Sequence, residues 1–285
     1  MMKRRAVVLI NPSRAEAVSA ARDLASILTS KGFDLVSPTD VQVENITSVA
    51  SDEIGEVEVA IVLGGDGTIL RGAEVTLLRE IPLLGINLGH VGFLAEVTKP
   101  SMNDIAESII NKSYVYENRM VLGYSVERAG SVISQGWALN EITVERSSTT
   151  MVELFVEIDR RPLSHWGCDG LICSTPTGST AYAFSAGGPV LWPEIDALVL
   201  LPISAHALFS RPMVVSTKSE IVITIESPVA LLSADALRKL PLVNGDRVVI
   251  TRNPQTIKLA HVNPTLFTDR LVAKFKLPVE GWRGE

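Results

Sequence analysis

The chain has 285 residues, of which 46% are hydrophobic and 20% charged, a composition typical of a globular protein with a sizeable core and not of a disordered one. Its formal net charge is −6 and its basic residues are scattered, so the sequence predicts binding neither to nucleic acid nor to an anionic membrane. The first apolar run, residues 6–10, is too short for a signal peptide, and no stretch approaches the roughly 20 residues that span a bilayer.

The first third of the chain alternates short apolar runs with segments of helical periodicity. Continuous apolar strands separated by helices indicate a parallel sheet covered on both faces. Ser101 is a candidate cap for the last of these helices. The predicted strands are 6–10, 33–37, 57–63 and 82–87, and the predicted helices are 15–31, 68–79 and 101–113.

From residue 121 onward the pattern changes to β-branched and alternating segments punctuated by Gly, Pro, Asn and Asp. The predicted strands there are 121–130, 138–146, 151–159, 220–227 and 247–253. The sequence therefore predicts an α/β N-terminal domain with a parallel sheet and a second, β-rich domain. Cys168 and Cys173 lack CxxC spacing, and we interpret them as two reduced thiols of a cytoplasmic protein.

A glycine-rich turn, Gly64-Gly65-Asp66-Gly67-Thr68, stands between the predicted strand 57–63 and the following helix. Strand-to-helix turns are where open α/β sheets bind ligands, and glycine there allows positive φ and a close approach of backbone N–H groups to a phosphate. Thr68 is positioned to cap the helix or to donate to the same phosphate. Asp66 is unexpected, because a carboxylate repels a phosphate unless it binds a metal or accepts a proton. Its alternative role is to shape the turn through a local hydrogen bond.

A second segment, residues 168–193, is rich in hydroxyl side chains and in glycine but has no basic residue. Neutral donors and acceptors of this kind suit a sugar, an adenine edge or phosphate oxygens, although a solvated loop has the same composition. Asp169 precedes the hydroxyl-rich part, and Asn140-Glu141 lies at the start of a predicted strand.

Together these motifs resemble the NAD kinase family. The similarity is carried by GGDGT at 64–68, GINLGHVGFL at 85–94, NE at 140–141 and DGLICSTPTGSTAYAFSAGGP at 169–189, with a C-terminal segment, FTDRLVAKF and GWRG, like that of actinobacterial members. The resemblance implies a kinase that phosphorylates the 2′-hydroxyl of the adenosine ribose of NAD, using ATP or polyphosphate and Mg²⁺ or another divalent metal. It also implies a homodimer or homotetramer, and domains at 1–119, joined by the tail 268–285, and 120–267.

The resemblance assigns the catalytic role to Asp66, as general base or through the metal, and leaves the metal ligands unassigned. His90 is placed near the site because it lies in the glycine-rich GHVG. The family usually has Asp-Gly near position 235, where this chain has Asp235-Ala236, so no role is carried over to that turn. The residues implied to bind the substrates are Gly64, Gly65, Gly67, Thr68, Arg71, His90, Phe93, Asn140, Glu141, Asp169, Thr177, Thr180, Ala181, Tyr182 and Ser185.

Two other functions share parts of this pattern. A lipid or sugar kinase with the same glycine turn would leave the hydroxyl-rich segment unexplained. A dinucleotide sensor without catalytic activity would have no need of the acid at position 66.

Overall fold

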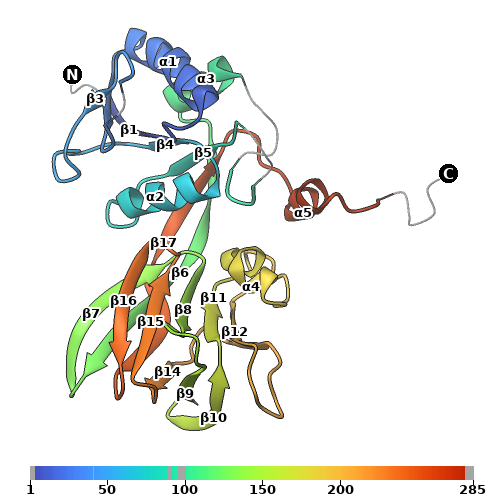
Figure 1. Cartoon of the computed structure of the whole chain (residues 1–285). Helices are drawn as coiled ribbons and strands as arrows, with labels where there is room; N and C mark the ends of the chain where they lie inside the picture. Colours follow the sequence, from blue (N-terminus) through green and yellow to red (C-terminus); the bar gives the residue numbers. More distant parts are fainter. Residues whose placement is uncertain (1–3, 41, 89–91, 96–100, 280–285) are drawn as a thin grey trace. The chain divides into compact units, whose positions relative to one another are not determined.

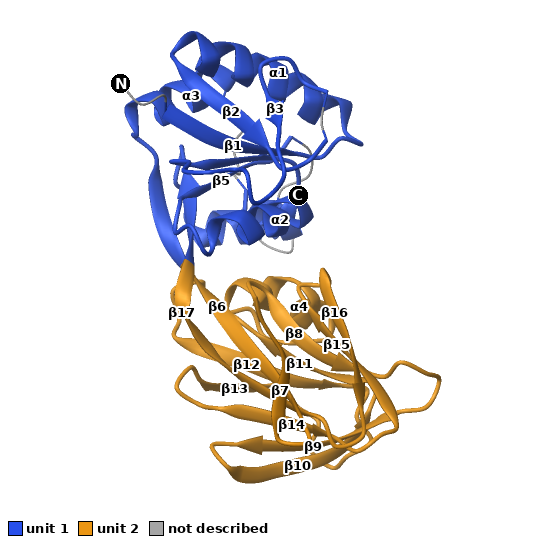
Figure 2. Ribbon diagram, turned by 90° about the vertical axis from the view of Figure 1, so that its left-hand side faces the viewer, with its two compact units in different colours: residues 1–118, 257–285 blue, residues 119–256 orange. Residues whose placement is uncertain are grey.

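The computed structural model describes residues 4–40, 42–88, 92–95 and 101–279. The chain forms two compact units, residues 1–118 with 257–285 and residues 119–256 (Figure 2). Two strands, β6 (Val115–Arg128) and β17 (Arg247–His261), have residues in both units. The tail after β17 thus belongs to the same unit as the N-terminal segment.

The first unit contains the predicted parallel sheet: β1 pairs in parallel with β2 and β4, β5 with β4 and β17, and β2 with β3. Its strand order is β17-β5-β4-β1-β2-β3, so the last residues of β17 pair with β5. The strand β3 escaped prediction because it has only two residues, both exposed. The strands are β1 (Arg4–Ile10), β2 (Phe33–Ser37), β3 (Thr47–Ser48), β4 (Ala60–Leu63) and β5 (Leu83–Ile86).

Helices cover both faces of this sheet, α1 and α3 on one face and α2 on the other (Figure 2). The apolar stripe of α1, which includes Leu24 and Leu28, is fully buried, as its periodicity predicts. Ser101 forms a capping box with Asp104, which confirms the predicted cap. The helices of this unit are α1 (Ala15–Ser30), α2 (Asp66–Thr76), α3 (Met102–Asn111) and α5 (Phe267–Phe275).

The second unit is β-rich, as predicted (Figure 1). Its two sheets share one hydrophobic core. One sheet contains β6, β7 (Ser131–Ala138), β9 (Val152–Ile158), β10 (Arg161–Cys168), β14 (Ile221–Ile225) and the first part of β17. The other has the order β13-β12-β11-β8-β15-β16 and is antiparallel throughout. Its strands are β8 (Glu141–Glu145), β11 (Gly170–Ser174), β12 (Ala197–Ile203), β13 (Met213–Ser216), β15 (Val229–Ala234) and β16 (Arg238–Val243).

The outer face of β11 and β12 is covered by a 3-10 turn, Thr177–Thr180, and the short helix α4 (Tyr182–Ser185). Ala183 of α4 is fully buried against Ile172 and Val199 of these strands. The hydroxyl-rich segment is therefore a packed part of the second unit.

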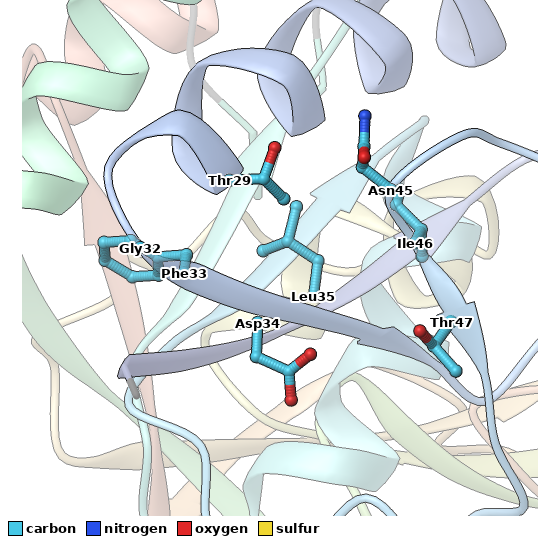
Figure 3. Close-up of a pocket in the computed structure, with 8 residues that line it drawn as sticks. All are labelled: Thr29, Gly32, Phe33, Asp34, Leu35, Asn45, Ile46 and Thr47. Carbon is cyan, nitrogen blue, oxygen red and sulfur yellow. The ribbon is translucent and has the colours of Figure 1, made fainter. Parts of the chain in front are cut away.

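A pocket of about 300 Å³ lies in the first unit between the end of α1, the start of β2 and residues 45–47 (Figure 3). Because the sheet is parallel, the start of β2 and the end of β4 lie at opposite edges. The pocket is thus distant from the glycine turn that follows β4.

Candidate functional site

The glycine turn connects β4 to α2 at the carboxyl edge of the parallel sheet, where α/β folds bind ligands. The turn does not use the positive φ that glycine allows, because Gly64, Gly65 and Gly67 are not among the glycines with positive φ. The helix begins at Asp66 with Gly65 as its N-cap. Of the two roles considered for Thr68, capping is therefore excluded, and donation to a phosphate stays a prediction.

The three glycines of the turn serve two different purposes. A Cβ on Gly64 would lie 2.5 Å from Oγ1 of Thr68, so this position must be glycine for the turn to close. A Cβ on Gly65 or Gly67 would meet no atom of the described residues within 4 Å. These two positions therefore leave open space beside the first N–H groups of α2, where an anion is electrostatically favoured.

Asp66 is held by a second loop instead of by its own turn. Its Oδ2 accepts a hydrogen bond from the N–H of Phe93 at 3.2 Å, and its Oδ1 accepts one from the N–H of Leu94 at 3.4 Å. Gly92 lies against the carboxylate so closely that a Cβ there would overlap it. A carboxylate has about four acceptor positions, and the described residues fill two of those of Asp66. Its place in the first helical turn also favours a negative charge.

The other residues predicted in the first unit have varied surroundings. Arg71 is exposed on α2. The ring of Phe93 is buried between those of Phe267 and Phe275 of α5, with centroid distances of 5.9 and 5.7 Å. Phe93 thus contributes its backbone N–H to the site and its ring to packing. His90 lies outside the described residues.

In the second unit, the predicted residues lie around the start of β8 and the hydroxyl-rich turn. The carbonyl oxygen of Asn140 accepts hydrogen bonds from the N–H of Thr175 and the hydroxyl of Ser174, at 2.9 and 3.1 Å. Gly178 packs on the Asn140 backbone with no room for a Cβ. The Asn-Glu pair and the turn are therefore one rigid structure.

Most hydroxyl groups of this segment are used internally. Ser174, Thr175 and Ser179 are fully buried and donate to backbone carbonyls, which the sequence did not reveal. Thr180 donates to the carbonyl of Thr177. The hydroxyl of Thr177 accepts a hydrogen bond from buried Arg119 at 3.4 Å.

Other predicted residues border a pocket of about 480 Å³ in the second unit. Its walls include Tyr182, Asp169, Glu145 and Arg146, and Asp169 forms an ion pair with Arg146 at 2.8 Å. Burial and the neighbouring Glu145 carboxylate, which accepts the hydrogen bond of the phenol, raise the pKa of Tyr182. Ser185 is exposed at the end of α4, and Ala181 is half-buried just before it.

Glu141 is the most electrostatically perturbed of the predicted residues. Burial, and secondarily the charge of Asp235, raise its pKa to about 8, although the N–H of Tyr182 donates to its carboxylate. Within the described part of the chain, its Oε2 is buried and has no hydrogen-bond partner. A buried acceptor left unpaired is costly, so this oxygen is suited to a ligand hydroxyl.

Asp235 is a residue of the site to which the sequence assigned no role. Its buried carboxylate accepts hydrogen bonds from the N–H groups of Leu139, Asn140 and Glu141, at 2.7 to 3.3 Å, and pairs with Arg238 at 2.9 Å. It therefore fixes the backbone that presents Asn140 and Glu141. Asp235 lies 94 residues after Glu141, so no local sequence pattern predicts the contact between them.

The described residues form neither a metal-binding cluster nor a membrane-spanning helix. Among the described residues, no group of three or more His, Cys, Asp or Glu side chains could hold a metal ion. None of the helices formed by these residues is long and apolar enough to cross a membrane.

Comparisons with known proteins agree with the geometry in both units. Residues 7–114 match the family model of the ATP-NAD kinase N-terminal domain, and residues 139–262 match that of the C-terminal domain. The chain is 44% identical to NAD kinase 2 of Streptomyces avermitilis, over 90% of this chain and 86% of the relative. It is 42% identical to the NAD kinase of Thermobifida fusca, over 99% and 92% of the two chains.

Two solved structures have the same fold. Yeast NADH kinase complexed with NADH superposes with a TM-score of 0.83 at 22% identity, covering 99% of this chain and 89% of that one. An NAD kinase from Archaeoglobus fulgidus in complex with ATP superposes with a TM-score of 0.70 at 25% identity, covering 96% and 98%.

Proposed function

The chain belongs to the NAD kinase family and phosphorylates NAD to NADP, and from that premise we propose that Asp66 activates the 2′-hydroxyl of the adenosine ribose. The single observation that carries the proposal is the position of the Asp66 carboxylate at the N-terminus of α2, held by two N–H groups of the 92–95 loop. A group fixed in this way has a defined direction, and the described residues leave acceptor positions on it for a substrate hydroxyl.

A ribose hydroxyl is a weak nucleophile until its proton is being removed. In our proposal Asp66 accepts this proton while the 2′-oxygen forms a bond to the terminal phosphorus of the donor. The bond between that phosphorus and the oxygen that joins it to the next phosphate breaks. With ATP as the donor, ADP leaves. The open space beside Gly65 and Gly67 accommodates the donor phosphates near the N–H groups of α2.

We propose ATP as the donor, a choice supported by the Archaeoglobus fulgidus structure in complex with ATP. Mg²⁺ fits the chemistry of this turn, because Mg²⁺ in such sites is held by one or two carboxylates together with substrate phosphates. Asp66 supplies the carboxylate of the glycine turn. A bound Mg²⁺ would neutralise part of the phosphate charge during transfer.

We propose that NAD is recognised by residues of the second unit, through the unpaired oxygen of Glu141 and the pocket lined by Tyr182 and Asp169. The remaining predicted residues around it, Asn140, Thr177, Thr180, Ala181 and Ser185, belong to the same rigid structure or border it. Neutral and acidic side chains suit the hydroxyl groups of ribose, which both donate and accept hydrogen bonds.

We also propose that the enzyme is a cytoplasmic homodimer or homotetramer. The exposed side chains of Leu208 and Phe209 in the second unit support self-association, because large apolar groups gathered on a surface favour an interface. The two buried, unbridged cysteines are compatible with a reducing compartment.

The substitution Asp66→Asn tests the proposed catalytic role. It keeps the shape of the side chain but removes its basicity, so kcat should fall by about 10²–10⁴-fold while the affinity for NAD is retained. Thermal melting, NAD titration and steady-state rates should be measured on one preparation. A folded variant with nearly normal kcat would remove Asp66 from the mechanism and favour a role in shaping the turn.

A further inference from the structure

Arg270 is the buried residue of α5, with only 2% of its surface exposed. A short helix that buries a guanidinium in place of an aliphatic side chain is unusual, because a charged group is buried only where it is extensively hydrogen-bonded. The hydrogen-bond partners of Arg270 therefore indicate its role.

Those contacts converge on the loop that holds Asp66. Nη1 of Arg270 donates to the carbonyl oxygen of Ala95 at 2.6 Å and to that of Phe93 at 3.3 Å. The N–H groups of Phe93 and Leu94 donate to the Asp66 carboxylate. The carbonyl groups of this short loop thus accept hydrogen bonds from Arg270, and its N–H groups donate hydrogen bonds to Asp66.

His261 provides a second anchor for the guanidinium. Nη2 of Arg270 lies 3.2 Å from Nδ1 of His261, and Nε2 of His261 lies 3.0 Å from Oε1 of Glu117. Because a guanidinium has no acceptor, Nδ1 must accept this hydrogen bond and Nε2 must carry the proton that is donated to Glu117. His261, at the end of β17, therefore orients Arg270 toward the loop.

We infer that Arg270 is a positioning residue for the phosphoryl transfer: it fixes the 92–95 loop so that two N–H groups hold the Asp66 carboxylate in its reactive direction. The inference rests on the proposed catalytic role of Asp66. The planar fork of Arg270 contacts two carbonyls and an imidazole at once, and a lysine ammonium at the end of a flexible chain does not reproduce this geometry.

The test is a double-mutant cycle in which kcat is measured for Arg270→Lys, Asp66→Asn and the double variant, all as full-length enzyme. Arg270→Lys should lower kcat by about 10- to 100-fold, since displacement of a catalytic group by about 1 Å costs about that much. KM for NAD should change less than about twofold, because the lysine variant leaves the second unit intact. In the Asp66→Asn background the lysine substitution should have almost no further effect on kcat.

Arg22→Lys is the matched control, since Arg22 is exposed on α1 of the same unit, and its kcat should equal that of the wild type. An unchanged kcat for folded Arg270→Lys, or the same loss of kcat with and without Asp66, would overturn the inference. A nearly normal kcat for Asp66→Asn alone would instead contradict the proposed role of Asp66, so the two failures are distinguishable.

A second pair of variants covers the case in which Arg270→Lys does not fold. His261→Phe removes the acceptor of the Arg270 guanidinium and should lower kcat, whereas His261→Asn places an amide oxygen near the position of Nδ1 and should restore most of it. Equal kcat for the two His261 variants would also overturn the inference.

Discussion

The stability of Glu141→Gln relative to the wild type should increase as the pH rises. The carboxyl group of Glu141 is buried, lies near Asp235 and has a pKa of about 8. A glutamine has nearly the same shape but no ionisation, so the substitution removes the cost of keeping a proton on this side chain. The variant therefore isolates the energetics of one group in the proposed NAD site.

The sign and size of this change in unfolding free energy follow from proton linkage. Below pH 4.5 the carboxyl is protonated in both states, and above about pH 8 it is ionised in both. Between these values only the folded state keeps the proton, so this group lowers the stability of the wild type by about 1.4 kcal/mol for each pH unit. The full interval from 4.5 to about 8 corresponds to about 5 kcal/mol. The unpaired amide of the glutamine offsets this by a pH-independent amount of about 1–3 kcal/mol.

Urea unfolding of both proteins at pH 5.5, 6.5 and 7.5 and constant ionic strength measures the effect. Other titrating groups cancel in the difference between the variant and the wild type. The stability advantage of Glu141→Gln should rise by about 1.4 kcal/mol per pH unit across this range. A difference that is constant with pH would show that Glu141 is ionised throughout and would refute the reasoning.

Three further substitutions test the backbone of the two units. Gly67→Ala should raise helix stability by about 0.5–1 kcal/mol, because its Cβ meets no atom of the described residues. It should also raise KM for ATP, because the methyl group enters the proposed phosphate space; chemical unfolding and donor titration measure the two effects. Gly92→Ala should lower kcat because its Cβ overlaps the Asp66 carboxylate, while NAD affinity by titration stays unchanged. Ala236→Gly should stabilise the protein by about 1 kcal/mol in urea unfolding, because Ala236 has a φ of 56°.

Periodicity predicted the first unit better than the second, because buried elements produce regular apolar patterns. In the second unit the sequence did not predict β10, β11, β12, β13, β15 and β16. The strands and helices of the first unit appear within a few residues of their predicted ranges, since fully buried strands and one-sided helices leave continuous or helical apolar patterns. The two-residue strand β3 has no such pattern. The strand predicted at 138–146 is instead the end of β7, a break and β8, because Asp235 binds the backbone N–H groups at the break.

The candidate site was less predictable, because side-chain chemistry does not say which groups are already satisfied. Composition presented Ser174, Thr175 and Ser179 as donors for a ligand, and the structure uses all three to hold backbone carbonyls. Arg270 lies in FTDRLVAKF and Asp235 in the turn near position 235, but neither segment indicated these contacts, since the backbone groups that these residues bind are 94 to 177 residues away in the chain. Contacts of this kind depend on the tertiary fold and leave no periodic signal.

The contrast between Asp66 and Glu141 shows why motif and environment must be considered together. Asp66 lies at a helix N-terminus, and two N–H donors fix the direction of its carboxylate, which suits it to accept a proton from a hydroxyl placed beside it. Glu141 lies in a buried place beside another carboxylate, so near neutral pH it keeps its proton and can donate as well as accept. A ribose has hydroxyl groups that need both kinds of partner. Two acidic residues of similar chemistry are thus adapted by their surroundings to different roles, one to remove a proton and the other to recognise the sugar.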